Sequence, residues 1–116
     1  MVTAAEVGRY LEEVLRRPRK DTVTYTEVAE KFHLGPINGM WSAHPLCQIF
    51  DELDQEDARA RRPFRTSVVI SKSLNQPGEG FFTAWQMYNE VNITAEEKLT
   101  VWLAELRKAQ EYNWEN

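Results

Sequence analysis

The sequence has 116 residues, which is enough for one hydrophobic core and too short for two of ordinary size. Apolar residues make up 42% and charged residues 28%, so the chain does not belong to the charge-rich, aromatic-poor class of disordered proteins. A formal net charge of −4 excludes a general attraction to nucleic acid and leaves only local basic patches.

No apolar run is long enough for a transmembrane span or the core of a signal peptide. The single Cys47 cannot form an internal disulfide, and together with His33 and His44 it falls short of a four-ligand zinc site. We therefore expect a single domain over residues 1–116 that is cytoplasmic and holds neither a metal nor another cofactor.

The first predicted element is a helix that starts at a capping box, Thr3-Ala-Ala-Glu6. Apolar residues then recur at helical spacing from Val7 to Leu15, and Pro18 prevents the helix from continuing much past Arg17. We expect this helix to bury one face.

A short β-branched stretch, Thr22 to Tyr25, predicts an edge strand. A second helix follows at once, capped by Thr24 with Glu27 or by Thr26 as a competing cap, and Gly35-Pro36 is expected to end it after about two turns.

A third helix is predicted from the spacing of Leu46, Ile49, Phe50 and Leu53. Because Pro45 is tolerated only in a first turn, the helix should start near Ser42 to His44, with residues 38–41 as its lead-in.

The second half of the chain predicts a strand over Thr66 to Ser71 and a turn over Asn75 to Gly80. Residues 81–88 indicate an aromatic-faced helix, although Phe81 to Thr83 also fits a second strand of a hairpin. A third capping box, Thr94 with Glu97, opens a last helix. Its expected apolar face consists of Leu99, Trp102, Leu103, Leu106 and Ala109.

This order of elements is that of a winged helix-turn-helix, so the predicted fold class is mainly α with a small β element and a C-terminal helix. Over residues 22–71 the chain resembles the DNA-binding half of alkyltransferase-like proteins, in which a Thr-Tyr-x-x-(Leu/Val)-Ala segment leads the helix-turn-helix. Thr24, Tyr25, Val28 and Ala29 match that segment. The Pro-Cys-His-Arg active site of the alkyltransferases is missing, because Arg62-Pro63-Phe64-Arg65 stands before the Val-Val strand. The resemblance therefore implies neither alkyl transfer nor the alkyl-base pocket.

Nearly the whole chain also resembles small uncharacterised bacterial and phage proteins. The shared features are a Val-Val strand ending near Lys72, a Pro-Gly-x-Gly-Phe turn at residues 77–81 and a terminal Trp-x-x-Glu-Leu helix at residues 102–106. This resemblance supports the fold and implies a bacterial or phage origin, without implying an activity.

If the helix-turn-helix interpretation holds, the third helix is the recognition helix and its leading polar residues face the major groove of double-stranded DNA. Thr24 and Thr26 would hold a phosphate, and the basic side chains around them would supply the electrostatic attraction. The predicted nucleic-acid contacts are Thr24, Thr26, Asn38, Trp41, Ser42, His44, Gln48, Arg59, Arg61, Arg62, Arg65 and Lys72.

The charges also favour a second interpretation. The third helix has no Arg or Lys between Asn38 and Ala58, and residues 51–57 are strongly acidic. Such a surface is suited to a basic protein partner, or to imitating DNA phosphates, with Trp41, Tyr112 and Trp114 as apolar anchors. The two basic runs, residues 16–20 and 59–65, are then solvated loops.

A buried thiol is the expected role of Cys47, because no third residue orients a Cys-His pair with His44. The tryptophans are expected in the core or at its edge, with Trp41 and Trp114 the most exposed. The last helix could also form a homodimer.

Because Cys47 is the only candidate nucleophile that we weigh and it lacks an orienting residue, we predict no catalysis. The sequence predicts a binding protein, either DNA-associated or regulatory, or else a protein-interaction module such as a phage-encoded modulator of a host enzyme.

Overall fold

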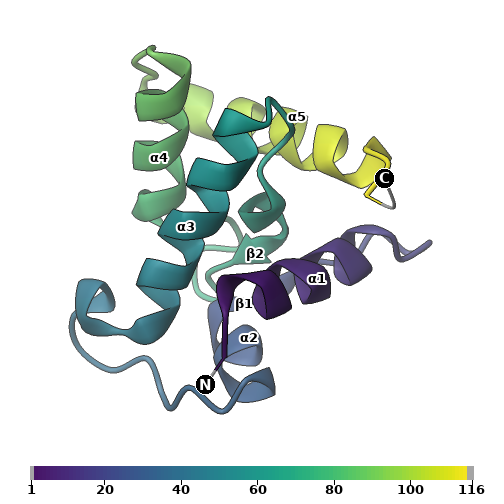
Figure 1. Ribbon diagram of the computed structural model, residues 1–116. Helices are drawn as coiled ribbons and strands as arrows, with labels where there is room; N and C mark the ends of the chain where they lie inside the picture. The colour runs from purple at the N-terminus through teal and green to yellow at the C-terminus, as the bar shows by residue number, and fades with distance from the viewer. Residues whose placement is uncertain (1, 115–116) are drawn as a thin grey trace.

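The computed structural model describes residues 2–114, and its first helix, α1 (Ala4–Leu15), begins where the sequence predicts (Figure 1). The Thr3 hydroxyl accepts the Glu6 N–H at 3.2 Å, and the Glu6 carboxylate accepts the Thr3 N–H at 3.0 Å. Val7, Leu11, Val14 and Leu15 form its buried face. The predicted capping box and apolar stripe are therefore confirmed.

The strand β1 (Val23–Thr24) leads directly into the helix α2 (Tyr25–Lys31). Thr24 caps α2 in a complete capping box with Glu27. The helix ends four residues before the predicted Gly35, because His33 adopts a left-handed conformation with φ 55°. The Leu34 N–H then donates to the Ala29 carbonyl at 2.9 Å, which satisfies the end of the helix without glycine.

Of the two threonines that compete for this cap, only Thr24 is expected to matter for stability. Replacing Thr24 with alanine removes the acceptor for the Glu27 N–H, so the free energy of unfolding should fall by about 1 kcal/mol. Thr26→Ala, an exposed neighbour on the same turn, should change it by less than about 0.5 kcal/mol. Urea unfolding followed by circular dichroism measures both values, and equal losses would contradict this assignment of the cap.

A 3₁₀ turn, η1 (Trp41–Ala43), precedes the long helix α3 (Pro45–Arg59). Pro45 occupies the first position of α3 and His44 is its N-cap, so the predicted start is confirmed. The His44 Nδ1 accepts the Leu46 N–H at 3.1 Å, and its Nε2 therefore carries the proton and donates to the Gly35 carbonyl at 3.1 Å.

The predicted strand over Thr66 to Ser71 is only partly correct. Residues Arg65–Val68 form a 3₁₀ turn, η2, and the strand β2 contains only Val69–Ile70. Val69 and Ile70 pair with Val23 and Thr24 in parallel, as a two-stranded sheet. The turn forms because the hydroxyls of Thr66 and Ser67 bond to Asp54 and to the Phe64 carbonyl, away from any strand ladder.

The segment after β2 folds back on itself in a tight loop that ends at the helix α4 (Glu79–Asn89). A single antiparallel bridge joins Ser71 and Gln76, with the Ser71 N–H donating to the Gln76 carbonyl at 2.8 Å. The aromatic-faced helix is confirmed, and the alternative strand over Phe81 to Thr83 is wrong because these residues are helical.

The last elements are the 3₁₀ turn η3 (Ala95–Glu97) and the helix α5 (Lys98–Glu111). The capping box of Thr94 and Glu97 is confirmed. The predicted apolar face is partly wrong: Trp102, Leu106 and Ala109 are buried, whereas Leu99 and Leu103 are exposed. Trp114, expected to be exposed, is buried, and its indole N–H donates to the Ala109 carbonyl.

The described chain is one compact, mainly helical domain. Its radius of gyration is 13.3 Å, as expected for a compact chain of this length. The turn η2 lies at the centre, against α1, α3 and α5, while α4 runs beside α3 (Figure 1). None of the helices in residues 2–114 combines the length and the apolar character that crossing a bilayer requires.

Candidate functional site

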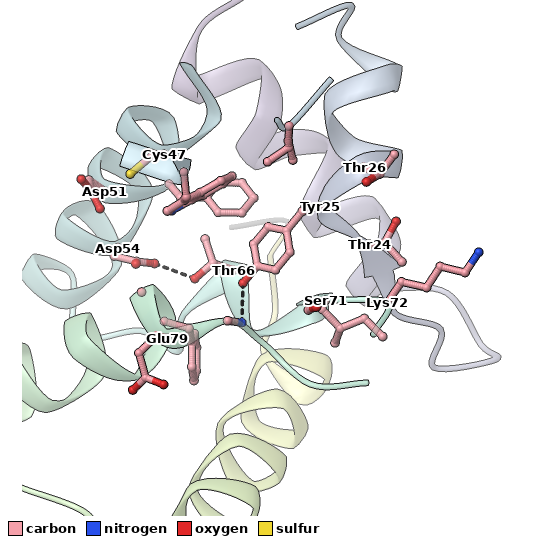
Figure 2. A pocket seen from close by; sticks show the side chains of 17 residues that line it. Thr24, Tyr25, Thr26, Cys47, Asp51, Asp54, Thr66, Ser71, Lys72 and Glu79 are labelled. Carbon is pink, nitrogen blue, oxygen red and sulfur yellow. Dashed lines mark hydrogen bonds between the residues drawn. The ribbon is translucent and has the colours of Figure 1, made fainter. Parts of the chain in front are cut away.

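A cavity of about 420 Å³ opens between the start of α2, the first half of α3 and the start of α4 (Figure 2). Four aromatic rings form much of its wall: Tyr25, Trp41, Phe50 and Phe81. The centroid of the Tyr25 ring lies 5.3 Å from that of Trp41 and 5.9 Å from that of Phe50. The size and the apolar lining are those of a ligand pocket.

Asp54 is a buried carboxyl group in the lining of this pocket, with 4% of its surface exposed. Its Oδ1 accepts the Thr66 hydroxyl at 2.6 Å, as the dashed line in Figure 2 shows. Within residues 2–114 the other carboxyl oxygen, Oδ2, has no protein hydrogen-bond partner and is not sealed from the pocket. Asp54 therefore has one oxygen fixed by the protein and one available to a ligand.

The environment of Asp54 keeps its carboxyl group protonated at neutral pH. Burial raises its pKa from 3.8 to about 8, and the nearby carboxylates of Asp57 and Asp51 add to this effect. The Thr66 hydroxyl and the more distant Arg65 act in the opposite direction, but they do not outweigh burial. The pocket thus contains a neutral carboxylic acid.

Tyr25 connects the two sides of the pocket. Its hydroxyl oxygen accepts the Gly78 N–H at 2.9 Å, which ties the start of α2 to the N-cap of α4. Burial raises the pKa of this phenol above its ordinary value of 10.0, and the Asp54 carboxyl adds to the shift. The hydroxyl therefore keeps its proton and can donate it to a second group in the pocket.

Three side chains at the rim carry charge: Asp51, Glu79 and Lys72. Glu79 is paired with Lys98 at 2.8 Å, and Asp51 lies on the exposed side of α3. When Asp54 is ionised, the acidic side chains that line the pocket outnumber Lys72, the one basic side chain among its described lining residues. The lining therefore favours a cation over an anion.

Cys47 also lines the pocket, but its thiol is not activated. Burial raises its pKa above 9.0 and the Asp51 carboxylate raises it further, so the thiolate is scarce at neutral pH. Among the described residues no hydrogen bond joins this thiol to the His44 ring, whose two nitrogens bond to Leu46 and Gly35. The arrangement is not that of a Cys-His nucleophile.

The raised pKa predicts how Cys47 reacts. Iodoacetamide should alkylate the folded protein at neutral pH more slowly than the urea-unfolded chain, and Asp51→Asn should speed the folded reaction by about two- to threefold. Glu52→Gln, an exposed neighbour that does not line the pocket, is the control and should leave the rate unchanged. Mass spectrometry measures the rates, and folded protein that reacts faster than unfolded chain would refute a raised thiol pKa.

The structure distributes the predicted nucleic-acid contacts over several places. Thr24, Thr26, Trp41 and Lys72 line the pocket. Asn38, Ser42 and Gln48 are exposed beside it, whereas His44 is half-buried and both of its ring nitrogens are already bonded within the chain. Of the residues predicted to lead the recognition helix, only Trp41 lines the cavity.

The predicted role of Arg65 in nucleic-acid binding is corrected by the structure. Its side chain is buried, with 5% of its surface exposed, and it forms ion pairs with Glu12, Glu56 and Asp57. Gly8 on α1 makes room for this guanidinium, since a Cβ at that position would lie 2.5 Å from Arg65 Nη1. Arg65 holds α1, η2 and α3 together and is not available to a phosphate.

The other arginines of the second basic run, residues 59–65, differ in their exposure to solvent. Arg62 is half-buried and pairs with Asp57, whereas Arg59 and Arg61 are exposed. Arg61 lines a second hollow of about 440 Å³ together with Lys108 and Glu105. The first basic run, residues 16–20, follows the end of α1, which Figure 1 places on the opposite side of the view from the start of α3. The first basic run therefore does not lie beside the start of the predicted recognition helix.

Sequence reasoning missed the acids that carry the chemistry of α3, Asp54 and Asp57. A signal for them was present, because Asp54 lies four residues after Phe50 and Asp57 four residues after Leu53. The apolar stripe of the helix thus continues into carboxylates, which indicates acids at core positions. Their partners, Thr66 and Arg65, come from another element and have no local signal.

No known protein family, curated protein or solved structure matches this chain. Within the described residues, no group of three or more His, Cys, Asp and Glu side chains is placed to hold a metal ion. The geometry of the pocket is therefore the main guide to function.

Proposed function

We propose that this chain is a non-catalytic binding protein that works as an interaction module for a basic segment of a protein partner. The observation that carries the proposal is the pocket of about 420 Å³, which combines aromatic walls with the acidic groups Asp51, Asp54 and Glu79. Of the two roles that the sequence leaves open, this arrangement favours the protein-interaction module over the DNA reader.

The walls of the pocket supply the apolar part of such an interface. Trp41 is half-buried and makes ring contacts with Tyr25, His44 and Phe50. A tryptophan held in this way loses little rotamer entropy on binding, and residues of this type dominate the energetics of interfaces. Trp41 is therefore the expected hot spot.

The surface of α3 supplies the electrostatic part. Asp51 and Glu52 are exposed on the helix. These charges attract a basic peptide and repel a nucleic-acid backbone. Because Arg62 and Arg65 are already paired with carboxylates, they add little to any attraction of DNA.

Fluorescence anisotropy with three probes tests the proposal. The first is a labelled peptide with one arginine flanked by lysines and glycines, the second is the same peptide with glutamate at every basic position, and the third is a mixed-sequence DNA duplex. At about 50 mM salt the basic peptide should bind, and the other two probes should not. No binding of the basic peptide would overturn the proposal, and binding of the duplex with a steep salt dependence in its place would favour the DNA reader.

Two variants link the binding to the pocket. Trp41→Ala should lower the affinity for the basic peptide by about 30-fold, as expected of a hot spot. Tyr112→Ala removes an exposed aromatic ring that does not line the pocket, and should leave the affinity unchanged. Circular dichroism confirms that both variants fold. Equal effects of the two substitutions would place the interface elsewhere.

A further inference from the structure

We propose that the pocket receives the guanidinium group of an arginine from the partner's basic segment, with Asp54 as its counter-ion. This inference rests on the proposed function and names the group that the pocket recognises. Three features of the pocket carry it: the free carboxyl oxygen at its floor, the aromatic rings of its walls and the balance of charge in its lining.

The floor of the pocket offers acceptors for a planar donor. Asp54 is nine-tenths buried, and its Oδ2 has no protein partner in residues 2–114 while Thr66 fixes Oδ1. A carboxylate in this position accepts the fork of N–H groups that a guanidinium presents. Since Thr66 holds the carboxyl group in one orientation, little entropy is lost when the ligand arrives.

The walls of the pocket suit the shape of an arginine side chain. Tyr25, Trp41, Phe50 and Phe81 line the same pocket as Asp54. A guanidinium is flat and weakly hydrated, and it stacks on aromatic faces, whereas an ammonium is a compact and strongly hydrated charge. The apolar stem of arginine also fits between aromatic rings. The pocket should therefore prefer arginine to lysine.

The proton of Asp54 makes the binding depend on pH. When the positively charged guanidinium enters, the carboxyl group releases its proton to solvent and an ion pair replaces the neutral acid. One proton is released per ligand bound, and no covalent bond forms or breaks. Below the pKa of about 8 the affinity should therefore rise about tenfold per pH unit.

Other groups near Asp54 do not produce this dependence. Asp57 and Arg65 form their own ion pair, and the pKa values of Tyr25 and Cys47 are raised, so that neither group ionises between about pH 6 and pH 8. Among residues 2–114, the charged and titratable groups that act on Asp54 or line the pocket with it are Asp51, Asp57 and Cys47 on α3, Arg65 on η2, Tyr25 on α2, Glu79 on α4 and Lys72 after β2.

The test compares the basic peptide with two copies in which the single arginine is replaced by citrulline or by lysine. Citrulline is a neutral group of almost the same shape, so this replacement should weaken binding by about 30-fold or more. The affinity of the lysine peptide should lie between those of the arginine and citrulline peptides. In Asp54→Asn, the arginine and citrulline peptides should bind within about threefold of each other, and the pH dependence should disappear.

The matched control is Glu13→Gln, which removes an exposed carboxylate on α1 outside the pocket and should keep both the preference for arginine and the pH dependence. Equal binding of the arginine and citrulline peptides would overturn the inference and leave the interaction module intact. Failure of every basic peptide to bind would instead overturn the proposed function, and this inference with it. Both variants preserve side-chain volume, and circular dichroism confirms that they fold.

Discussion

Arg65→Met should lower the free energy of unfolding by about 3–5 kcal/mol, the largest loss expected from a single substitution away from the apolar core. Arg65 donates to Asp57, Glu12 and Glu56, and Asp57 has no exposed surface. Without the guanidinium, the donors left to the buried Asp57 carboxylate in the described part of the chain are the backbone N–H of residue 65 and the Arg62 side chain. Urea unfolding monitored by tryptophan fluorescence measures the loss.

Two further variants separate the ion pair from a general effect of charge. Arg59→Met removes an exposed arginine at the end of α3 and should cost less than about 0.5 kcal/mol. The double variant Asp57→Leu/Arg65→Met removes both buried charges. It should recover part of the lost stability, because no buried charge is then left without a partner. Equal stability of Arg65→Met and Arg59→Met would contradict the role assigned to Arg65.

Asp54→Asn should make the protein more stable, by an amount that depends on pH. The raised pKa means that the folded state holds the Asp54 proton more tightly than the unfolded state does. The contribution of the Asp54 carboxyl group to the free energy of unfolding is therefore fully present below its ordinary pKa of 3.8. This contribution is lost progressively as the pH rises to about 8. Above that pH the variant should exceed the wild type by an amount on the order of 5 kcal/mol.

Unfolding experiments at about pH 4 and about pH 9 measure this difference. The two proteins should differ by less than about 1 kcal/mol at the lower pH, where the carboxyl group is neutral in the folded state and only about half ionised in the unfolded state. Asp51→Asn, a change of the same kind at an exposed position one turn earlier on α3, should alter stability little at either pH. A variant that is less stable than the wild type at the higher pH would contradict the account.

This gain in stability should accompany a loss of function. An acid that costs free energy in the folded state persists only if its environment or its role requires it, and destabilised groups cluster at binding sites. Asp54→Asn is therefore expected to be more stable and to bind the arginine peptide more weakly. A buried carboxyl group with a purely structural role would not combine these two effects.

The local elements of the fold could be predicted from the sequence because their signals are local. Thr3 with Glu6, Thr24 with Glu27 and Pro45 each mark a helix start within four residues, and the structure confirms all three. The sequence predicts the end of α2 too late, because the left-handed His33 ends the helix before Gly35, where its end is expected. Asn, Asp and His are the non-glycine residues that adopt this conformation most often.

The candidate site was less predictable because its groups are brought together by tertiary contacts. Thr66 lies in a segment whose β-branched residues predict a strand, and its bond to Asp54 turns that segment into η2. Arg65 was interpreted as part of a basic loop, since its partners Glu12 and Asp57 lie on two other helices. Leu99 and Leu103 continue an apolar stripe at helical spacing, yet α5 turns them outward to bury Trp102 and Glu105 instead.

An NMR titration of the ¹³Cγ resonance of Asp54, with and without the arginine peptide, shows whether this acid is the group that pairs with arginine. We expect a midpoint near pH 8 for the free protein, and a shift to lower pH when the peptide is present. The citrulline peptide should leave the midpoint in place. A free-protein midpoint near the ordinary value of 3.8, or a midpoint that the arginine peptide does not move, would contradict this role of Asp54.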